Sequence, residues 1–148
     1  VWDNIIFGLK KNQVDRAKIQ DIITTVNLSG FEKAYPSQLS GGMQQRAAIA
    51  RALAYEPTFI LMDEPFASLD FITRGELQTE LLDIQKELQK TILLVTHQLD
   101  EALLLAQRIV VLHADSSVRV WELPYPRDLT SPELTALREE ITAECRKD

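Results

Sequence analysis

The first informative feature of the sequence is the octapeptide Leu39-Ser40-Gly41-Gly42-Met43-Gln44-Gln45-Arg46. Ser40 is a good helix N-cap residue, and residues 43–54 hold five alanines and neither glycine nor proline, which predicts a helix. Glycines at a helix start leave backbone N–H groups uncovered at the positive end of the helix dipole, where phosphate and other anions bind. The alternative is a Gly-Gly turn that only begins a helix.

The second feature is the run Phe59-Ile60-Leu61-Met62-Asp63-Glu64-Pro65, which is apolar and ends in two adjacent carboxylates. A continuous apolar run of this length is typical of a strand buried on both faces. Charged residues at the C-terminal end of such a strand lie where open parallel sheets bind ligands. Asp63 is therefore a candidate Mg²⁺ ligand, and Glu64 a candidate for orienting or deprotonating a water. The alternative role for both is a helix cap at the strand end.

Strands and helices alternate along the chain, which favours a parallel sheet in an α/β domain. The apolar pattern predicts helices over residues 2–9, 14–28, 43–54, 73–89 and 100–107, and strands over 58–62, 91–96, 108–112 and 118–121. Ser131 and Pro132 predict the start of a last helix. We expect Cys145, on the apolar face of that helix, to be a small core residue.

Composition excludes several classes of protein. The chain has 148 residues, of which 45% are hydrophobic and 26% charged, as expected for one soluble globular domain. Its net charge of −6 gives no indication of a nucleic-acid surface. The apolar runs are too short to cross a bilayer, and the single cysteine excludes an internal disulfide and fits a reducing cytoplasm.

Four motifs, in order, resemble those of the ABC-type ATPases, the nucleotide-binding subunits that power membrane transporters. Residues 39–46 resemble the family's signature motif and residues 59–64 its Walker B strand. Ser68-Leu69-Asp70 resembles the D-loop, and Thr96-His97 the switch histidine. The resemblance implies a P-loop NTPase fold of the ABC ATPase type.

The resemblance also indicates which part of that fold is present. It implies a helical subdomain with the signature motif over residues 1–55, the C-terminal part of the α/β ATPase core over 56–122, and a linker and C-terminal helix over 123–148. No G-x-x-x-x-G-K-[ST] phosphate loop occurs in the sequence, so we expect the C-terminal portion of a longer subunit. In the family, the strand that leads into this loop lies between the strands at 91–96 and 108–112. Without it, these two strands either leave a gap or close up into a non-native sheet, and the fragment is the simpler interpretation.

In the family, two subunits sandwich two ATP molecules, and the signature of one completes the site of the other. By resemblance, Ser40, Gly41 and Gly42 contact the γ-phosphate held by the partner subunit. Gln44 lies near that interface, and Arg46 braces the helical subdomain.

The other motif residues take their roles from the same resemblance. Asp63 binds Mg²⁺ through water, and Glu64 polarises the attacking water. His97 hydrogen-bonds the γ-phosphate and holds Glu64 in place. Ser68 and Asp70 span the dimer interface; the alternative for these two is an ordinary turn.

Residues 123–133 are similar to the C-terminal segment of the nitrate, sulfonate and taurine importer subfamily. This implies an ATP- and Mg²⁺-dependent subunit at the cytoplasmic face of the membrane. Its partners would be a second ATPase subunit, two membrane permeases and, indirectly, an extracytoplasmic solute-binding protein, with no nucleic acid. Two alternatives stay open: a truncated, non-catalytic module that pairs with a complete subunit, and an ABC ATPase without a transporter. The latter carry large insertions, which the run up to the signature lacks.

Overall fold

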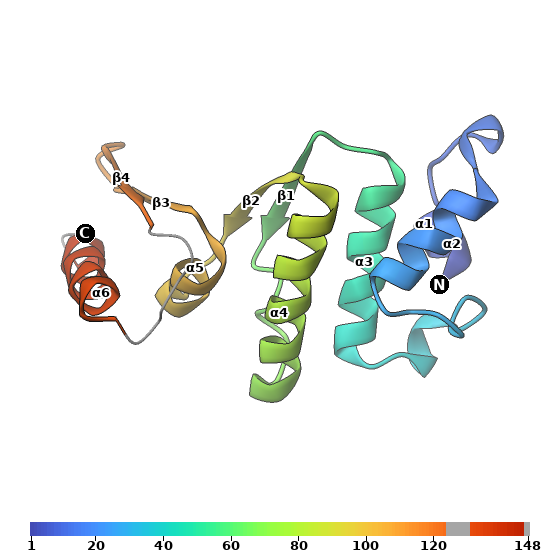
Figure 1. Ribbon diagram of the computed structural model, residues 1–148, viewed down its shortest axis with the longest axis horizontal. Helices are drawn as coiled ribbons and strands as arrows, with labels where there is room; N and C mark the ends of the chain where they lie inside the picture. The colour runs from blue at the N-terminus through green and yellow to red at the C-terminus, as the bar shows by residue number, and fades with distance from the viewer. Residues whose placement is uncertain (124–130, 147–148) are drawn as a thin grey trace. The chain divides into compact units, whose positions relative to one another are not determined.

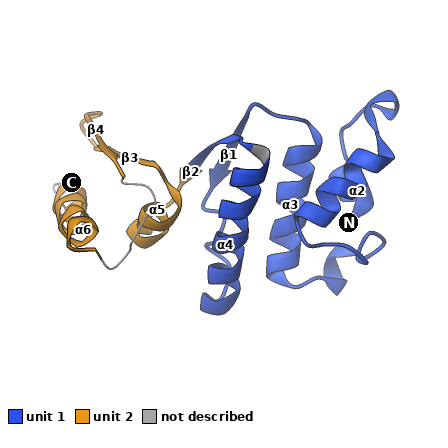
Figure 2. Cartoon of the chain, in the orientation of Figure 1, with its two compact units in different colours: residues 1–93 blue, residues 94–148 orange. Residues whose placement is uncertain are grey.

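The computed structural model describes residues 1–123 and 131–146 (Figure 1). These fall into two compact units, residues 1–93 and 94–148 (Figure 2). The predicted linker at residues 124–127 lies outside the described residues, as does most of the segment that resembles the sulfonate-type importers. The predicted subdomains, residues 1–55, 56–122 and 123–148, are those implied by the family resemblance, and their limits stay predictions.

The first unit consists mainly of helices. They are α1 Trp2–Ile5, α2 Arg16–Thr25, α3 Gly41–Ala54 and α4 Phe71–Leu88, with 3₁₀ turns at Lys11–Gln13 and Pro36–Gln38. The core of the unit is formed by fully buried aliphatic side chains of these helices, Ile5, Ile19, Ile23, Ala50 and Leu77, together with Leu28 of the segment after α2. Burial of this apolar surface is the main force that packs α1 and α2 against α3.

The first two helices are shorter than predicted. The first ends at Ile5 rather than residue 9, and Gly8 has a φ of +88°, a left-handed conformation that favours glycine and turns the chain. The second begins at Arg16 because the Asp15 carboxylate accepts hydrogen bonds from the backbone N–H groups of Ala17 and Lys18, and it ends before Asn27, whose φ is +54°.

Strands β1 Phe59–Asp63 and β2 Thr91–Val95 are neighbours in a two-stranded sheet and are connected by α4. The prediction that β1 is buried on both faces is wrong for this chain. Ile60 and Met62 are buried, whereas Phe59 and Leu61 are 51% and 62% exposed. Side chains alternate between the two faces of a strand, and the described residues cover only one of them.

The second unit joins a hairpin to two helices. Its elements are α5 Leu99–Leu105, β3 Arg108–Leu112, β4 Val118–Glu122 and α6 Pro132–Cys145. The two strands are antiparallel, and Val110 pairs with Val120. The core of the unit consists of Leu103, Ile109, Trp121, Leu123, Leu134 and Ile141. Arg119 also lies over the ring of Trp121, with 5.9 Å from its guanidinium carbon to the ring centre.

The prediction that Cys145 is a core residue is wrong, because this side chain is exposed. Glu144 is buried instead, and its carboxylate accepts a hydrogen bond of 2.6 Å from Arg119 and lies 3.3 Å from the His113 ring. The inward face of α6 therefore follows the prediction at Leu134, Leu137 and Ile141, and differs only in its last position, where Glu144 replaces Cys145. Arg119 and His113 of the hairpin lie against this carboxylate, where an apolar side chain was expected.

Within the described residues, β2 pairs only with β1, and β3 only with β4. The predicted alternative in which β2 and β3 close up into one sheet is therefore not adopted. No helix of the described ranges is long and apolar enough to cross a membrane.

Candidate nucleotide site

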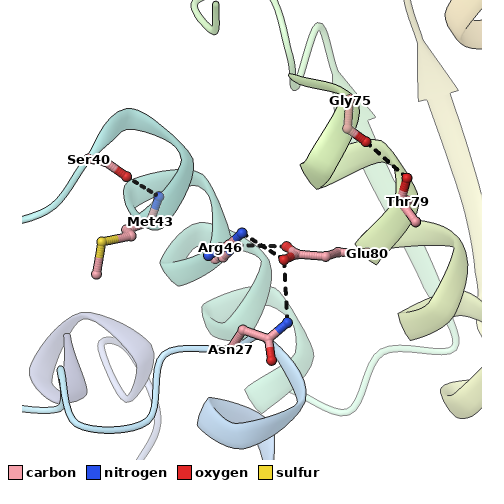
Figure 3. A network of polar contacts seen from close by, with 7 residues as sticks. All are labelled: Asn27, Ser40, Met43, Arg46, Gly75, Thr79 and Glu80. Carbon is pink, nitrogen blue, oxygen red and sulfur yellow. Dashed lines mark hydrogen bonds and ion pairs between the residues drawn. The ribbon is translucent and has the colours of Figure 1, made fainter. Parts of the chain in front are cut away.

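The glycine-flanked start of α3 has the predicted form. Ser40 is extended, and its Oγ accepts a hydrogen bond of 3.2 Å from the backbone N–H of Met43 (Figure 3). Ser40 is thus the N-cap of a 14-residue helix. Ser40 and Gly41 are exposed, whereas Gly42 is buried. The start of the helix therefore presents Ser40 and Gly41 to the surface, at the end where backbone N–H groups lack intrahelical partners and anions bind.

The side chain of Gln44 bonds to the turn that precedes α3. Its side-chain amide donates hydrogen bonds to the carbonyl oxygens of Pro36 at 3.0 Å and Leu39 at 3.3 Å. These bonds hold the turn that precedes α3 against the first turn of the helix. The proximity of Gln44 to a partner subunit stays a prediction.

The two signature glycines allow a close approach between two motifs that are far apart in the sequence. A Cβ atom on Gly41 would lie 3.3 Å from Leu69 Cδ2, and one on Gly42 would lie 2.7 Å from Thr73 Cγ2. Leu69 is the central residue of Ser68-Leu69-Asp70, and Thr73 is in the first turn of α4. The structure therefore brings the signature and D-loop residues together.

In the D-loop, Leu69 is buried and Ser68 and Asp70 are exposed. Asp70 is the N-cap of α4, and its Oδ1 accepts hydrogen bonds of 3.1 Å from the backbone N–H groups of Ile72 and Thr73. These bonds, with one from the Thr73 side chain as the largest cause, lower the pKa of the Asp70 carboxyl from its ordinary value. In this chain Asp70 acts as a helix cap, while an interface role for Ser68 and Asp70 stays a prediction.

The Asp70 cap makes a testable contribution to acid stability. Because its pKa is lowered from 3.8 in the folded chain, the charged cap stabilises the fold above that pH and is lost as the pH falls through the folded-state pKa. Asp70→Asn keeps an acceptor oxygen without the charge. We therefore expect its stability to fall less than that of the parent between about pH 5 and pH 2, measured by urea unfolding. Equal acid dependence in both proteins would contradict this.

The two carboxylates at the end of β1 have different surroundings. Asp63 is the last residue of the strand and is exposed, whereas Glu64 is half-buried and has a φ of +46°. A left-handed non-glycine residue is uncommon and clusters at functional sites. The described residues contain no group of three or more His, Cys, Asp or Glu side chains that could hold a metal ion alone. An exposed Asp63 nevertheless fits Mg²⁺, which is usually held by one or two carboxylates together with water and substrate phosphates.

His97 is exposed and lies between β2 and α5. The turn around it is held by Thr96, whose hydroxyl donates a hydrogen bond of 2.6 Å to Glu101 and accepts one of 3.0 Å from the backbone N–H of Gln98. Glu101 is 3% exposed and was not identified from the sequence. His97 and Glu64 belong to different compact units, and the predicted contact between them stays a prediction.

Glu80 is a second residue that sequence reasoning missed. The sequence places it with the acidic residues on the outer side of the 73–89 helix, but it accepts two hydrogen bonds from Arg46 of α3 (Figure 3). Arg46 precedes the buried residues Ala47, Ile49 and Ala50 on α3. An arginine beside such a buried helix face was the available signal, because a partly buried cation needs an anionic partner.

Comparison with known proteins points to the same family as the motifs. A family model described as ABC transporter matches residues 1–67, which include the signature and the end of β1. The chain belongs to the ABC transporter ATP-binding family. It is 47% identical to the aliphatic sulfonates import ATP-binding protein SsuB of Bacillus licheniformis, over 97% of this chain and 58% of that protein. It is 49% identical to the uncharacterized ABC transporter ATP-binding protein MJ0412 of Methanocaldococcus jannaschii, over 95% of this chain and 56% of that protein.

Comparison with solved structures gives the same family. A solved inward-facing structure of an ABC transporter described as metal-chelate type has a TM-score of 0.72 to this chain. It is 26% identical and covers 93% of this chain, which covers 58% of it. The predicted fold class is confirmed as a partial ABC ATPase fold of the P-loop type, with mixed α/β structure and parallel strands. The chain spans little more than half the length of the relatives that it matches.

Proposed function

We propose that this chain is the C-terminal portion of the ATP-hydrolysing subunit of an ABC importer for a small solute of the sulfonate, nitrate or taurine kind. The observation that carries the proposal is the packing of the glycine-flanked start of α3 on the D-loop, which leaves Ser40, Gly41 and Ser68 exposed. Such an exposed helix start suits the triphosphate of a nucleotide bound to a facing subunit. Similarity to SsuB proteins supports the solute class.

In the proposed site, ATP is held between two subunits. Ser40, Gly41 and Gly42 donate to its γ-phosphate, with Gln44 at the edge of the interface. Bound Mg²⁺ would neutralise charge that develops on the phosphates, and Asp63 is the residue that would hold it through water. Glu64 orients the attacking water and accepts its proton.

Three residues outside β1 and α3 complete the proposal. His97 hydrogen-bonds the γ-phosphate. Its exposed position between β2 and α5 is compatible with this role, because a ligand can reach the residue. Asp70 and Ser68 meet the facing subunit, and the Asp70 cap keeps this part of the loop in one conformation before the subunits associate.

A groove in the first unit supports an assembly with membrane permeases. It has a volume of about 1200 Å³ and is lined by residues of α1, α2, α3 and the loop at residues 30–36. Phe7 and Tyr35, which line it, are 72% and 73% exposed, and Arg16 lies 5.3 Å over the Trp2 ring. Exposed aromatic side chains beside an arginine are typical of a protein interface. The complex would lie at the cytoplasmic face of the membrane, and the solute-binding protein would contact only the permeases.

A second candidate is a non-catalytic module that pairs with a complete subunit, favoured by the lack of a phosphate loop in the 148 residues. ATP turnover distinguishes the two. We expect none above background from the pure chain, and turnover from the same chain preceded by the phosphate-loop half of a related subunit such as SsuB. Robust hydrolysis by the pure chain would contradict both candidates, and an inactive joined protein would contradict the first.

A further inference from the structure

We propose that Glu80 is a positioning residue for the signature helix. It fixes the rotation of α3 relative to α4, and therefore where Ser40 and Gly41 meet the γ-phosphate. The inference rests on the proposed function. All the residues concerned lie in the first unit, and Figure 3 shows their contacts.

The contact between Glu80 and Arg46 is bidentate. Arg46 Nε donates to Glu80 Oε2 at 2.7 Å, and Arg46 Nη2 donates to Glu80 Oε1 at 2.6 Å. The two side chains are 18% and 24% exposed. Two parallel hydrogen bonds to a planar guanidinium fix direction as well as distance. This pair therefore constrains the angle at which α3 meets α4, which a single ion pair would not do.

A third element joins the same carboxylate. Asn27 Nδ2 lies 3.4 Å from Glu80 Oε1, and Asn27 follows α2 in a left-handed conformation with a φ of +54°. The Glu80 carboxylate is thus shared between the end of α2 and the second turn of α3. Removing the Glu80 carboxylate would therefore break the contacts of α4 with both Asn27 and Arg46.

The positions of the contacts along the helices explain their effect on the site. Gly42 and Thr73 touch in the first turns of α3 and α4, while Arg46 and Glu80 meet about one turn farther along α3 and two turns farther along α4. Two contact points fix the relative rotation of two helices, whereas one allows them to pivot. Ser40 and Asp70, the N-caps of these helices, lie just beyond the first contact. A pivot there would move the helix starts that the proposed site uses.

The test separates nucleotide binding from subunit association. The protein is this chain preceded by the phosphate-loop half, with Glu64→Gln to arrest turnover. We expect Glu80→Gln to weaken ATP-dependent dimerisation about tenfold, measured by sedimentation, while the ATP affinity of the monomer stays within about twofold, because the phosphate loop lies outside this chain. Arg46→Lys keeps the charge but loses the planar fork, and should behave like Glu80→Gln. The exposed Glu76→Gln, one turn earlier on α4, is the matched control.

A double variant distinguishes positioning from general stability. Arg46→Met with Glu80→Leu replaces the pair by apolar packing, which restores stability in comparable cases. We expect it to recover the parent's melting temperature but not its dimerisation. If the double variant recovered dimerisation together with the melting temperature, the positioning role would be overturned. A Glu80→Gln protein that dimerises like its parent would overturn it as well. Failure of the Glu64→Gln parent to dimerise with ATP would instead overturn the proposed function.

A second measurement needs only the 148-residue chain. Glu80→Gln should raise hydrogen exchange of the amides at residues 41–44 about tenfold, since the first turn of α3 loses its fixed orientation. Amides of the β3–β4 hairpin in the other unit should exchange as before. Unchanged exchange at residues 41–44 would overturn the inference whatever the fate of the proposed function.

Discussion

Glu64→Gln in the subunit with its phosphate-loop half lowers ATP turnover about 10²–10⁴-fold and leaves ATP binding intact. Glutamine has the shape of glutamate but does not accept the proton of an attacking water. Glu64 has a left-handed backbone with a φ of +46°. Glutamine has the same unbranched Cβ and Cγ as glutamate, so the substitution adds no backbone strain. The ATP-bound dimer should therefore persist. Phosphate release and sedimentation with ATP measure the two effects.

The control for this experiment is Asp83→Asn, because Asp83 is an exposed carboxylate on α4 that pairs with Lys86. It should leave turnover unchanged within about twofold. If Glu64→Gln retained the wild-type rate, Glu64 would not be the general base. If the variant lost ATP binding as well, the carboxylate would be needed for nucleotide affinity, and the assignment to the water would be wrong.

Gly42→Ala in the 148-residue chain lowers the free energy of unfolding by about 1–3 kcal/mol. The added Cβ would lie 2.7 Å from Thr73 Cγ2, so that the Thr73 side chain or the two helices must shift. Gly75 provides a matched comparison, because it also lies inside a helix and no heavy atom lies within 4 Å of its added Cβ. Gly75→Ala should gain about 0.5–1 kcal/mol. Urea unfolding measures both values.

The cause of the Gly42 effect can be tested directly. Thr73→Ser removes the methyl group that the new Cβ would meet and keeps the hydroxyl that bonds Asp70. We expect it to recover most of the stability lost by Gly42→Ala. Gly41→Ala should cost less, since its contact at 3.3 Å is with the end of the flexible Leu69 side chain. A Gly42→Ala protein as stable as Gly75→Ala would show that the close approach has no energetic consequence.

The sequence predicted the parts of the fold that depend on neighbouring residues. Ser40 and Ser131 are caps of the predicted helices because a short polar side chain followed by helix-forming residues satisfies the first backbone N–H groups locally. Strand β3 has the predicted bounds, and β1 and β2 differ from theirs by about one residue. For the site, the structure places Ser40, Gly41, Ser68 and Asp70 around one contact between α3 and α4.

Features that depend on distant residues were not predictable from local pattern. The exposure of Phe59 and Leu61 depends on what covers the second face of β1, which the strand's own residues do not encode. Glu80 pairs with a residue 34 positions away, and its spacing on α4 resembles that of any solvated glutamate. The one-residue shift from Cys145 to Glu144 depends on Arg119 and His113 of the β3–β4 hairpin. Each of these three errors concerns a partner that is distant in the sequence.

The division into two compact units has a spectroscopic consequence. The chain has two tryptophans, and Trp2 and Trp121 fall one in each unit. Each ring lies under an arginine, Arg16 in one case and Arg119 in the other. Single Trp→Phe variants therefore give the intrinsic emission of each half separately. Overlaying their denaturation curves reveals whether the halves melt in one cooperative event or in two.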